Sequence, residues 1–102
     1  MNSYVVNLYP NPNGTAQGQA LDVDGTVVSF TSNFDPKTTS VLVTSSGGDF
    51  YVTFDGSTPS SSNGHQIASP YIGWWSKDSA RLAKFLATGG SIAHLRLSQF
   101  TY

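Results

Sequence analysis

The chain has 102 residues, a formal charge of -1 and charged side chains at only 11% of its positions. This length suits a single domain with one core, and so weak a charge argues against binding to nucleic acid or to an anionic membrane. Cysteine is absent, which excludes disulfides, thiolate metal sites and a thiol nucleophile. Glutamate is absent too, and Ser, Thr, Gly and Asn dominate the polar residues, a composition that favours an all-β protein.

The amino-terminal segment MNSYVVNLYP lacks the basic start and long apolar run of a secretory signal, which predicts folding in the cytoplasm. No window of the chain reaches the roughly 18 apolar residues of a membrane span. Residues 3–9, SYVVNLY, predict a first strand. Residues 9–20, rich in Asn, Pro and Gly, are expected to form a loop or an extended arm that reaches a neighbouring subunit.

Residues 21–30, LDVDGTVVSF, contain a D-x-D-G-T pattern that resembles the haloacid-dehalogenase phosphotransferases, in which Asp22 would be the nucleophile and Asp24 the acid and base. The preceding residues, NGTAQGQA, are not the buried strand that this fold requires, and the chain has no room for its βαβ units. No acidic partner follows at a calcium-loop spacing. We therefore interpret Asp24-Gly25 as a turn that precedes a strand at 26–31, TVVSFT.

Two further strands are predicted at 39–45, TSVLVTS, and 49–55, DFYVTFD. Alternation assigns Phe50, Val52 and Phe54 to one face, which we expect to be core. In the earlier strand, Val41 and Val43 share a face and Leu42 points to the other. The intervening SSGG is short enough for a hairpin, so we predict that these strands pair.

The segment PYIGWWSKD at 70–78 concentrates three aromatic residues, Tyr71, Trp74 and Trp75. Adjacent tryptophans on a strand point to opposite faces, so one can fill the core while the other faces outward as an interface or ligand anchor. The alternative is that both tryptophans are mostly buried between two layers. We take all three aromatic residues as interface candidates.

No set of residues predicts catalysis, so the chain is expected not to be an enzyme and to need no cofactor or metal. His65 and His94 lie in different predicted elements without a metal-ligand spacing. The serines include no G-x-S-x-G motif. The basic residues Lys77, Arg81 and Lys84 are typical of a solvated face rather than an anion site.

The segment SKDSARLAKFLATGG is ambiguous. Leu82, Phe85 and Leu86 suit a helical face that Ser76 or Asp78 could cap, but the run is only about two turns long. The following SIAHLRLSQF alternates strictly, with Ala93, Leu95 and Leu97 on one face. We predict that ARLAKFLA pairs with it as a hairpin through TGGS, with a short helix as the alternative.

The stretch FYVTFDGSTPSSSNG resembles the immunoglobulin-like module found at the ends of chitobiases and other glycoside hydrolases, written Y-T-x-D-G-S-x-P. Asp55, Gly56, Ser57 and Pro59 match this motif. Each has a local structural role: the aspartate can close a turn, the glycine can take a positive φ, and the proline stiffens the exit. The resemblance implies a carbohydrate-binding or spacer module.

A longer resemblance, over roughly residues 39–102, is to small virion proteins of tailed bacteriophages. It rests on the order of several short motifs, found here at Val52 to Pro59, Gly64-His65, Trp75-Ser76, Ala80 to Leu86 and Ser98 to Phe100. The resemblance implies a capsid decoration (cement) or head-tail joining protein, made in the host cytoplasm and located in the virion. Its partners would be major capsid, portal or tail proteins and further copies of itself, in a homo-oligomer or many-copy assembly.

These expectations combine into one fold. About seven short strands in about 100 residues predict a small antiparallel β-sandwich, immunoglobulin-like or jelly-roll-like, with residues 1–102 as a single domain.

Overall fold

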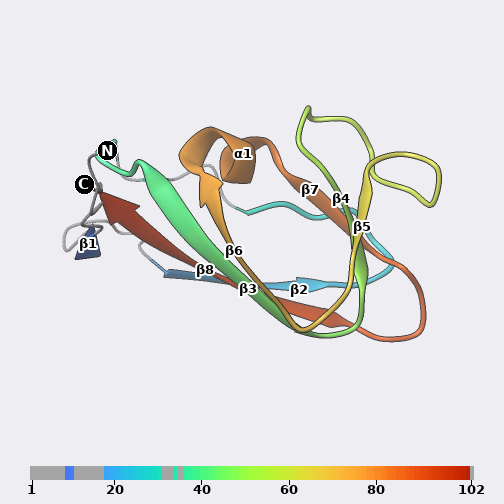
Figure 1. Ribbon diagram of the computed structural model, residues 1–102. Helices are drawn as coiled ribbons and strands as arrows, with labels where there is room; N and C mark the ends of the chain where they lie inside the picture. Colours follow the sequence, from blue (N-terminus) through green and yellow to red (C-terminus); the bar gives the residue numbers. More distant parts are fainter. Residues whose placement is uncertain (1–8, 11–17, 31–33, 35, 102) are drawn as a thin grey trace, which may run out of the picture.

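The computed structural model describes residues 9–10, 18–30, 34 and 36–101. Its strands form two antiparallel sheets packed as a sandwich, so the predicted all-β fold is confirmed (Figure 1). In chain order the elements are β1 (Tyr9–Pro10), β2 (Gly18–Val23), β3 (Ser40–Gly47), β4 (Phe50–Thr53), β5 (His65–Ile67), β6 (Tyr71–Ser76), α1 (Lys77–Leu82), β7 (Lys84–Ala87) and β8 (Ala93–Thr101).

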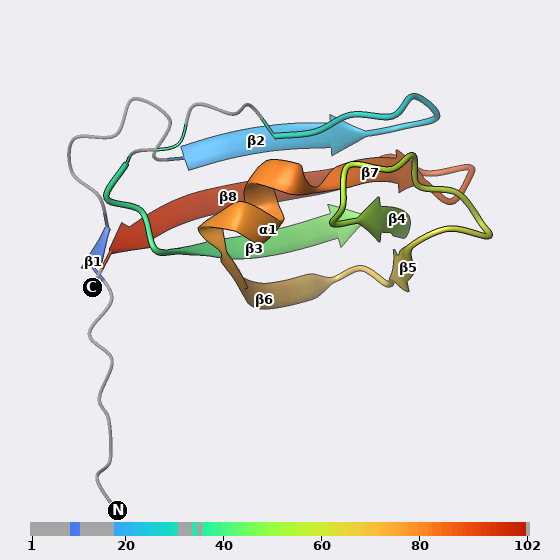
Figure 2. The ribbon, with the colours of Figure 1, turned by 90° about the horizontal axis from the view of Figure 1, so that it is seen from above.

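The larger sheet is built around β8. One side of β8 pairs with β3, and β3 pairs in turn with β6; the other side pairs with β2 and with the two residues of β1. The smaller sheet has the order β5-β4-β7. Seen from above, the smaller sheet and α1 both lie over the same face of the larger sheet (Figure 2). Within the described residues, the opposite face of the larger sheet is therefore left uncovered.

The core fills the space between the two sheets. Its centre is Phe85, which is fully buried and meets Phe30 and Phe50 edge-on, with ring centroids 5.2 and 5.7 Å away. The other buried apolar residues are Val23, Val41, Val43, Val52, Ala80, Ala83, Ala93, Leu95 and Leu97. The alternation predicted for β3 and β8 is thus confirmed. In β4 it holds for Phe50 and Val52, but Thr53, expected on the other face, is buried, and Phe54 is only partly buried.

The predicted hairpin between residues 39–45 and 49–55 is wrong. Both strands exist, but β3 belongs to the larger sheet and β4 to the smaller one. Gly47 (φ 85°) and Gly48 carry the chain from one sheet to the other, and the Gly48 N–H donates to the Ile92 carbonyl at 2.9 Å. The buried faces of β3 and β4 therefore meet across the core instead of lying side by side.

The second predicted hairpin is wrong for the same reason. Only Lys84–Ala87 of the first half is a strand, and β7 lies in the smaller sheet while β8 lies in the larger one. The short helix that was the alternative is confirmed as α1. Ser76 is its N-cap, because its hydroxyl accepts a hydrogen bond from the Ser79 N–H at 3.1 Å.

The region around Asp24 also differs from the prediction. The turn is confirmed, since the Asp24 carboxylate accepts from the Thr26 N–H at 2.9 Å, but the strand comes before it, as β2, and not after it. Residues 26–30 are not a strand. Val28 forms a single bridge to Phe85 and covers the edge of β7.

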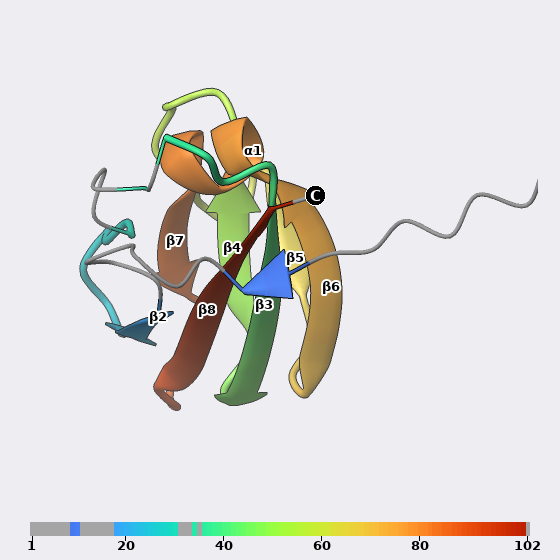
Figure 3. The same ribbon diagram turned by 90° about the vertical axis from the view of Figure 1, so that its left-hand side faces the viewer.

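The segment expected to form a loop or an extended arm, residues 9–20, is paired within the chain at both of its ends. Tyr9 and Pro10 pair with Thr101 and Phe100, and Gly18–Val23 pair along β8 of the same chain. Residues 11–17, and residues 3–8 of the predicted first strand, lie outside the described residues. Figure 3 shows β1 beside the carboxyl-terminal end of β8.

Candidate interaction surface

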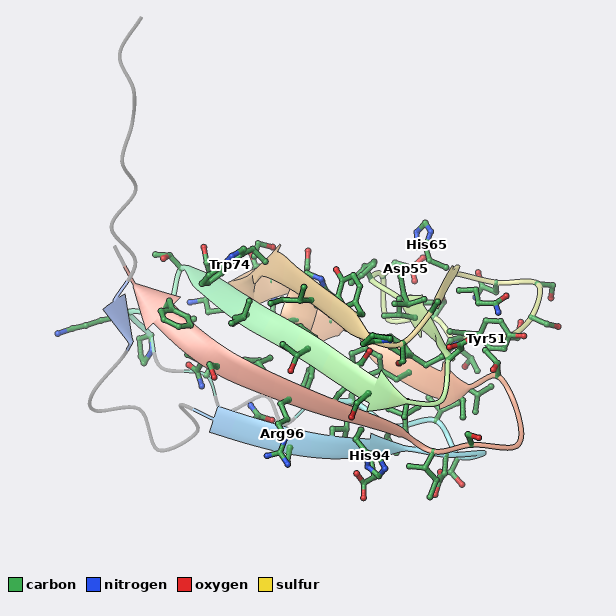
Figure 4. The ribbon with its side chains drawn as sticks, turned by 60° about the horizontal axis from the view of Figure 1, so that its bottom comes forward. Tyr51, Asp55, His65, Trp74, His94 and Arg96 are labelled. Carbon is green, nitrogen blue, oxygen red and sulfur yellow. The ribbon has the colours of Figure 1, made fainter. Side chains whose placement is uncertain are left out.

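Strand β6 places its two tryptophans on opposite faces of the larger sheet, as the alternation predicts. Tyr71, Gly73 and Trp75 face the inner layer and are half-buried. Ile72 and Trp74 point to the uncovered face, with 71% and 53% of their surfaces exposed. The three predicted interface candidates therefore do not form one site, and only Trp74 lies on the outer face (Figure 4).

Trp75 and Tyr71 hold β6 against the core. The Trp75 ring is nearly parallel to that of Phe85, with centroids 6.1 Å apart, and it meets Phe54 edge-on at 5.1 Å. Its indole N–H donates to the Tyr71 hydroxyl at 2.8 Å. Gly73 makes this arrangement possible, because a Cβ at that position would overlap the Tyr71 ring.

Trp74 lies over neighbouring strands of the outer face. It is directly opposite Leu42 on β3, and it meets Phe100 of β8 edge-on with ring centroids 5.0 Å apart. Ile72 stands two residues along on the same face of β6. We call the set Leu42, Ile72, Trp74 and Phe100 the outer apolar patch. Exposed apolar clusters of this kind mark interaction sites.

Sequence reasoning missed Phe100 and Leu42 as members of this patch. Their outward direction follows from alternation in β8 and β3. Their closeness to Trp74 follows only from the strand order β8-β3-β6. Leu42 of β3 is directly opposite Trp74 of β6, and the neighbouring outward residue of β3, Ser40, is directly opposite Phe100 of β8.

The outer face becomes charged toward β2. His94 on β8 is directly opposite Asp22 on β2, and the Asp22 carboxylate lies 2.8 Å from the His94 Nδ1. Arg96 lies two residues along on β8, on the same face. Asp22 and Asp24 are thus used separately, one in a surface contact with His94 and the other in a turn. The outer face has a neutral apolar side at β6 and a charged side at β2 (Figure 4).

The D-G-S-x-P segment forms a tight loop after β4. The Asp55 carboxylate accepts from both the N–H and the hydroxyl of Ser57, at 3.0 and 2.5 Å, and Gly56 has a φ of 82°. Asn63 donates to the Ser57 hydroxyl and to the Thr58 carbonyl, at 3.1 and 2.8 Å. Pro59 is buried. The motif's polar groups are used within the loop itself.

This loop borders a shallow hollow that His65 also lines. His65 is exposed at the start of β5, with its ring 6.1 Å from that of Phe54.

Among the basic residues, Arg81 is paired with Asp78 at 3.4 Å, and Lys77 and Lys84 are half-buried on separate elements. Within the described residues, no group of three or more His, Asp or Glu side chains gathers as a metal site.

Ser57 tunes the acidity of Asp55. Its hydroxyl, and then its backbone N–H, lower the pKa of Asp55 by hydrogen bonding to the charged form. We expect Ser57→Ala to raise this pKa toward the ordinary aspartate range, with a partial shift because the N–H remains. A carboxyl-carbon NMR titration of Asp55 measures the change. Thr58→Ala, which leaves both hydrogen bonds in place, is the control, and equal pKa values in wild type and Ser57→Ala would contradict the assignment.

The same hydrogen bonds predict a pH dependence of stability. Because the folded pKa of Asp55 lies below the unfolded one, the carboxylate's stabilising effect is complete above about pH 4 and is lost as pH falls through the lowered pKa. Ser57→Ala should therefore reduce the amount of folding stability that is lost when the pH falls through this range.

Comparison with known proteins identifies no relative. No family model, curated protein or solved structure matches the chain. In the described part of the chain, no helix has both the length and the apolar character needed to cross a membrane.

Proposed function

We propose that the chain is a structural component of a bacteriophage virion, a capsid decoration or head-tail joining protein that acts through protein-protein contacts. The observation that carries this proposal is the outer apolar patch, where Trp74 and Ile72 are 53% and 71% exposed on an uncovered sheet face. Interface hot spots are enriched in tryptophan on such surfaces. The ordered motifs at 39–102 that resemble small virion proteins supply the class of partner.

The patch has the form of an interface centre with a polar rim. Trp74, Leu42 and Phe100 supply contiguous apolar surface across three strands. Ser98 and Thr44 lie next to them on the same face, and the Asp22–His94 pair lies at the far side. Apolar residues surrounded by small polar ones are typical of protein interfaces.

Quantitative mass spectrometry of gradient-purified particles tests the proposal. The expected result is a fixed ratio to the major capsid protein, near one or a simple fraction for decoration, and a few copies for a joining role. Absence of the chain from the particles would overturn the proposal.

Trp74→Ala is expected to reduce incorporation into particles by about tenfold or more, since central tryptophans carry a large share of binding energy. The control is Leu82→Ala, which removes a side chain of similar exposure (41%) from α1, away from the patch. Occupancy of particles by each variant, at equal expression, is the measurement. Equal incorporation of the two variants would show that the patch is not the contact surface.

A second candidate function is carbohydrate binding. It is favoured by one observation, the exposed indole of Trp74 beside small hydroxyl side chains, since an aromatic face can stack on a sugar ring while hydroxyls bond to it. Affinity for a polysaccharide that is lost in Trp74→Ala, together with absence from particles, would support this function in place of the first.

A further inference from the structure

The outer edge of β6 is an open backbone edge. In the described part of the chain β6 pairs only with β3, and it ends the larger sheet. The register of that pair continues to Lys77, whose N–H donates to the Thr39 carbonyl at 3.3 Å. In an antiparallel ladder alternate residues bond to the same neighbour. Odd-numbered residues of β6 therefore bond to β3, and Ile72 and Trp74 direct their N–H and C=O groups toward the open edge.

The bonding of β3 confirms this parity. Gly48 continues the register of β3 with β8, and its N–H donates to the Ile92 carbonyl at 2.9 Å. Even-numbered residues of β3 therefore face β8, and odd-numbered ones face β6. The two independent hydrogen bonds give the same assignment.

Strand β6 itself carries no charged residue and no proline, although Pro70 and Lys77 flank it. Edge strands are protected by lysine, proline, bulges or inward charges. Residues 71–76, YIGWWS, contain none of the charged residues or prolines that would do so. Among the even-numbered residues, whose backbone groups are open, Ile72 and Trp74 also carry the most exposed large side chains of this strand. The strand thus offers hydrogen-bonding groups and apolar surface together.

We propose that two copies of the chain pair through β6, antiparallel about a twofold axis at Gly73. Such an edge is self-complementary, because each even-numbered residue of one copy meets an even-numbered residue of the other. Ile72 of each copy lies opposite Trp74 of the other. These two residue pairs are hydrogen-bonded pairs with two main-chain hydrogen bonds each, four in all. The register also forms two pairs of an aromatic and a β-branched side chain, a favourable cross-strand combination.

Charge complementarity favours a second, antiparallel copy as the partner. Lys77 follows β6 at one end and Ser69 precedes it at the other, so in an antiparallel pair the Lys77 end of one strand lies near the Ser69 end of the other. The Ser69 N–H is bonded to the Asp49 carboxylate at 3.0 Å, so a lysine of each copy approaches an aspartate of the other. The chain's formal charge of -1 produces little repulsion between copies.

The glycine suits the axis position. A residue on the twofold of this register is in a non-hydrogen-bonded pair, where the two Cα atoms approach most closely. Gly73 has no side chain of its own there, and the space beside its Cα is filled by the Tyr71 ring of the same chain. The dimer joins two larger sheets edge to edge and places two outer apolar patches on one continuous face. It deepens the proposed function by naming one partner of the interface, although its test requires no virion.

Sedimentation equilibrium of the full chain, over concentrations up to about 1 mM, is the first test. We expect a reversible dimer of twice the 10.9 kDa chain mass. Ile72→Pro removes an N–H that points to the open edge and leaves the bonds to β3 intact, so it should raise the dimer dissociation constant by about tenfold or more. Ile72→Ala keeps the N–H and should have a smaller effect. A monomer at every concentration, or equal dimerisation of Ile72→Pro and wild type, would overturn the proposal.

Cysteine crosslinking tests the register without dependence on one variant's stability, because the native chain has no cysteine. A mixture of Ile72→Cys and Trp74→Cys chains, oxidised together, should give more crosslinked dimer than either variant alone. Efficient crosslinking of either variant with itself would overturn the axis at Gly73. A dimer that is absent from particles would overturn the virion role alone, and a monomer found in particles would overturn the dimer alone.

Discussion

Phe85→Ala is expected to lower the free energy of unfolding by about 3 to 5 kcal/mol, the range for removal of a buried phenylalanine. Phe85 is fully buried on β7 and contacts the rings of Phe30, Phe50 and Trp75. These rings come from both sheets and from the segment after β2. Alanine at this position would therefore remove contacts between the layers. It would also leave a cavity that the surrounding strands cannot easily fill.

Chemical denaturation with a tryptophan-fluorescence readout measures this change, because Trp75 stacks on Phe85. Leu86→Ala is the matched control. It alters the next residue of the same strand, whose half-buried side chain points to the other face. A loss for Phe85→Ala no greater than that for Leu86→Ala would show that the core is not centred on Phe85.

Gly47→Ala is expected to cost about 3 kcal/mol through two additive effects. Gly47 has a φ of 85°, which costs an L-residue about 1 to 2 kcal/mol. A Cβ there would also lie 2.5 Å from the Ile92 carbonyl oxygen, an overlap that costs about 1 to 3 kcal/mol more. This position matters because the chain crosses between the sheets just after it.

Two other glycines separate the effects. Gly56 has nearly the same φ, 82°, with open space around it, so Gly56→Ala reports the backbone term alone. Gly25 has neither restraint, and Gly25→Ala should be close to neutral. Thermal unfolding of the three variants should rank them Gly47, Gly56, Gly25 by loss of stability. Equal losses at Gly47 and Gly56 would show that the contact with the Ile92 carbonyl is not tight.

The sequence predicted which face of each strand is buried better than it predicted which strands pair. Val41, Val43, Phe50 and Val52 are all in the core, as expected. The alternation of apolar and polar residues identifies the inward face of each strand. Both sheets of a sandwich turn their inward faces toward the same core, so alternation does not say to which sheet a strand belongs. A short Gly-containing link therefore fits a crossing between sheets as well as a hairpin. Both wrong hairpins, at SSGG and at TGGS, have this origin.

The errors near Asp24 and Ser76 have local causes. The strand Gly18–Val23 contains Gly, Ala and Asp, residues with low strand preference, and its pairing along β8 outweighs that preference. The helix α1 is only six residues long, too short for helical periodicity to stand out. Its capping serine was the more reliable signal.

The interaction surface was predictable only in part. Alternation separated Trp74 from Trp75, and the structure assigns the outer position to Trp74 and the inner one to Trp75. Phe100 is 26 positions further along the chain, and no periodic pattern links it to Trp74. Only the order of strands in the larger sheet brings the two rings together.

Hydroxyl-radical footprinting by mass spectrometry tests most directly whether the outer apolar patch becomes buried in protein-protein contacts. Labelling of isolated protein at low concentration is compared with labelling of assembled particles. Trp74 and Ile72 are expected to become protected on assembly, while Leu82 on α1 and Val27 in the segment after β2 stay labelled. Unchanged labelling of Trp74 and Ile72 in the particles would contradict the account.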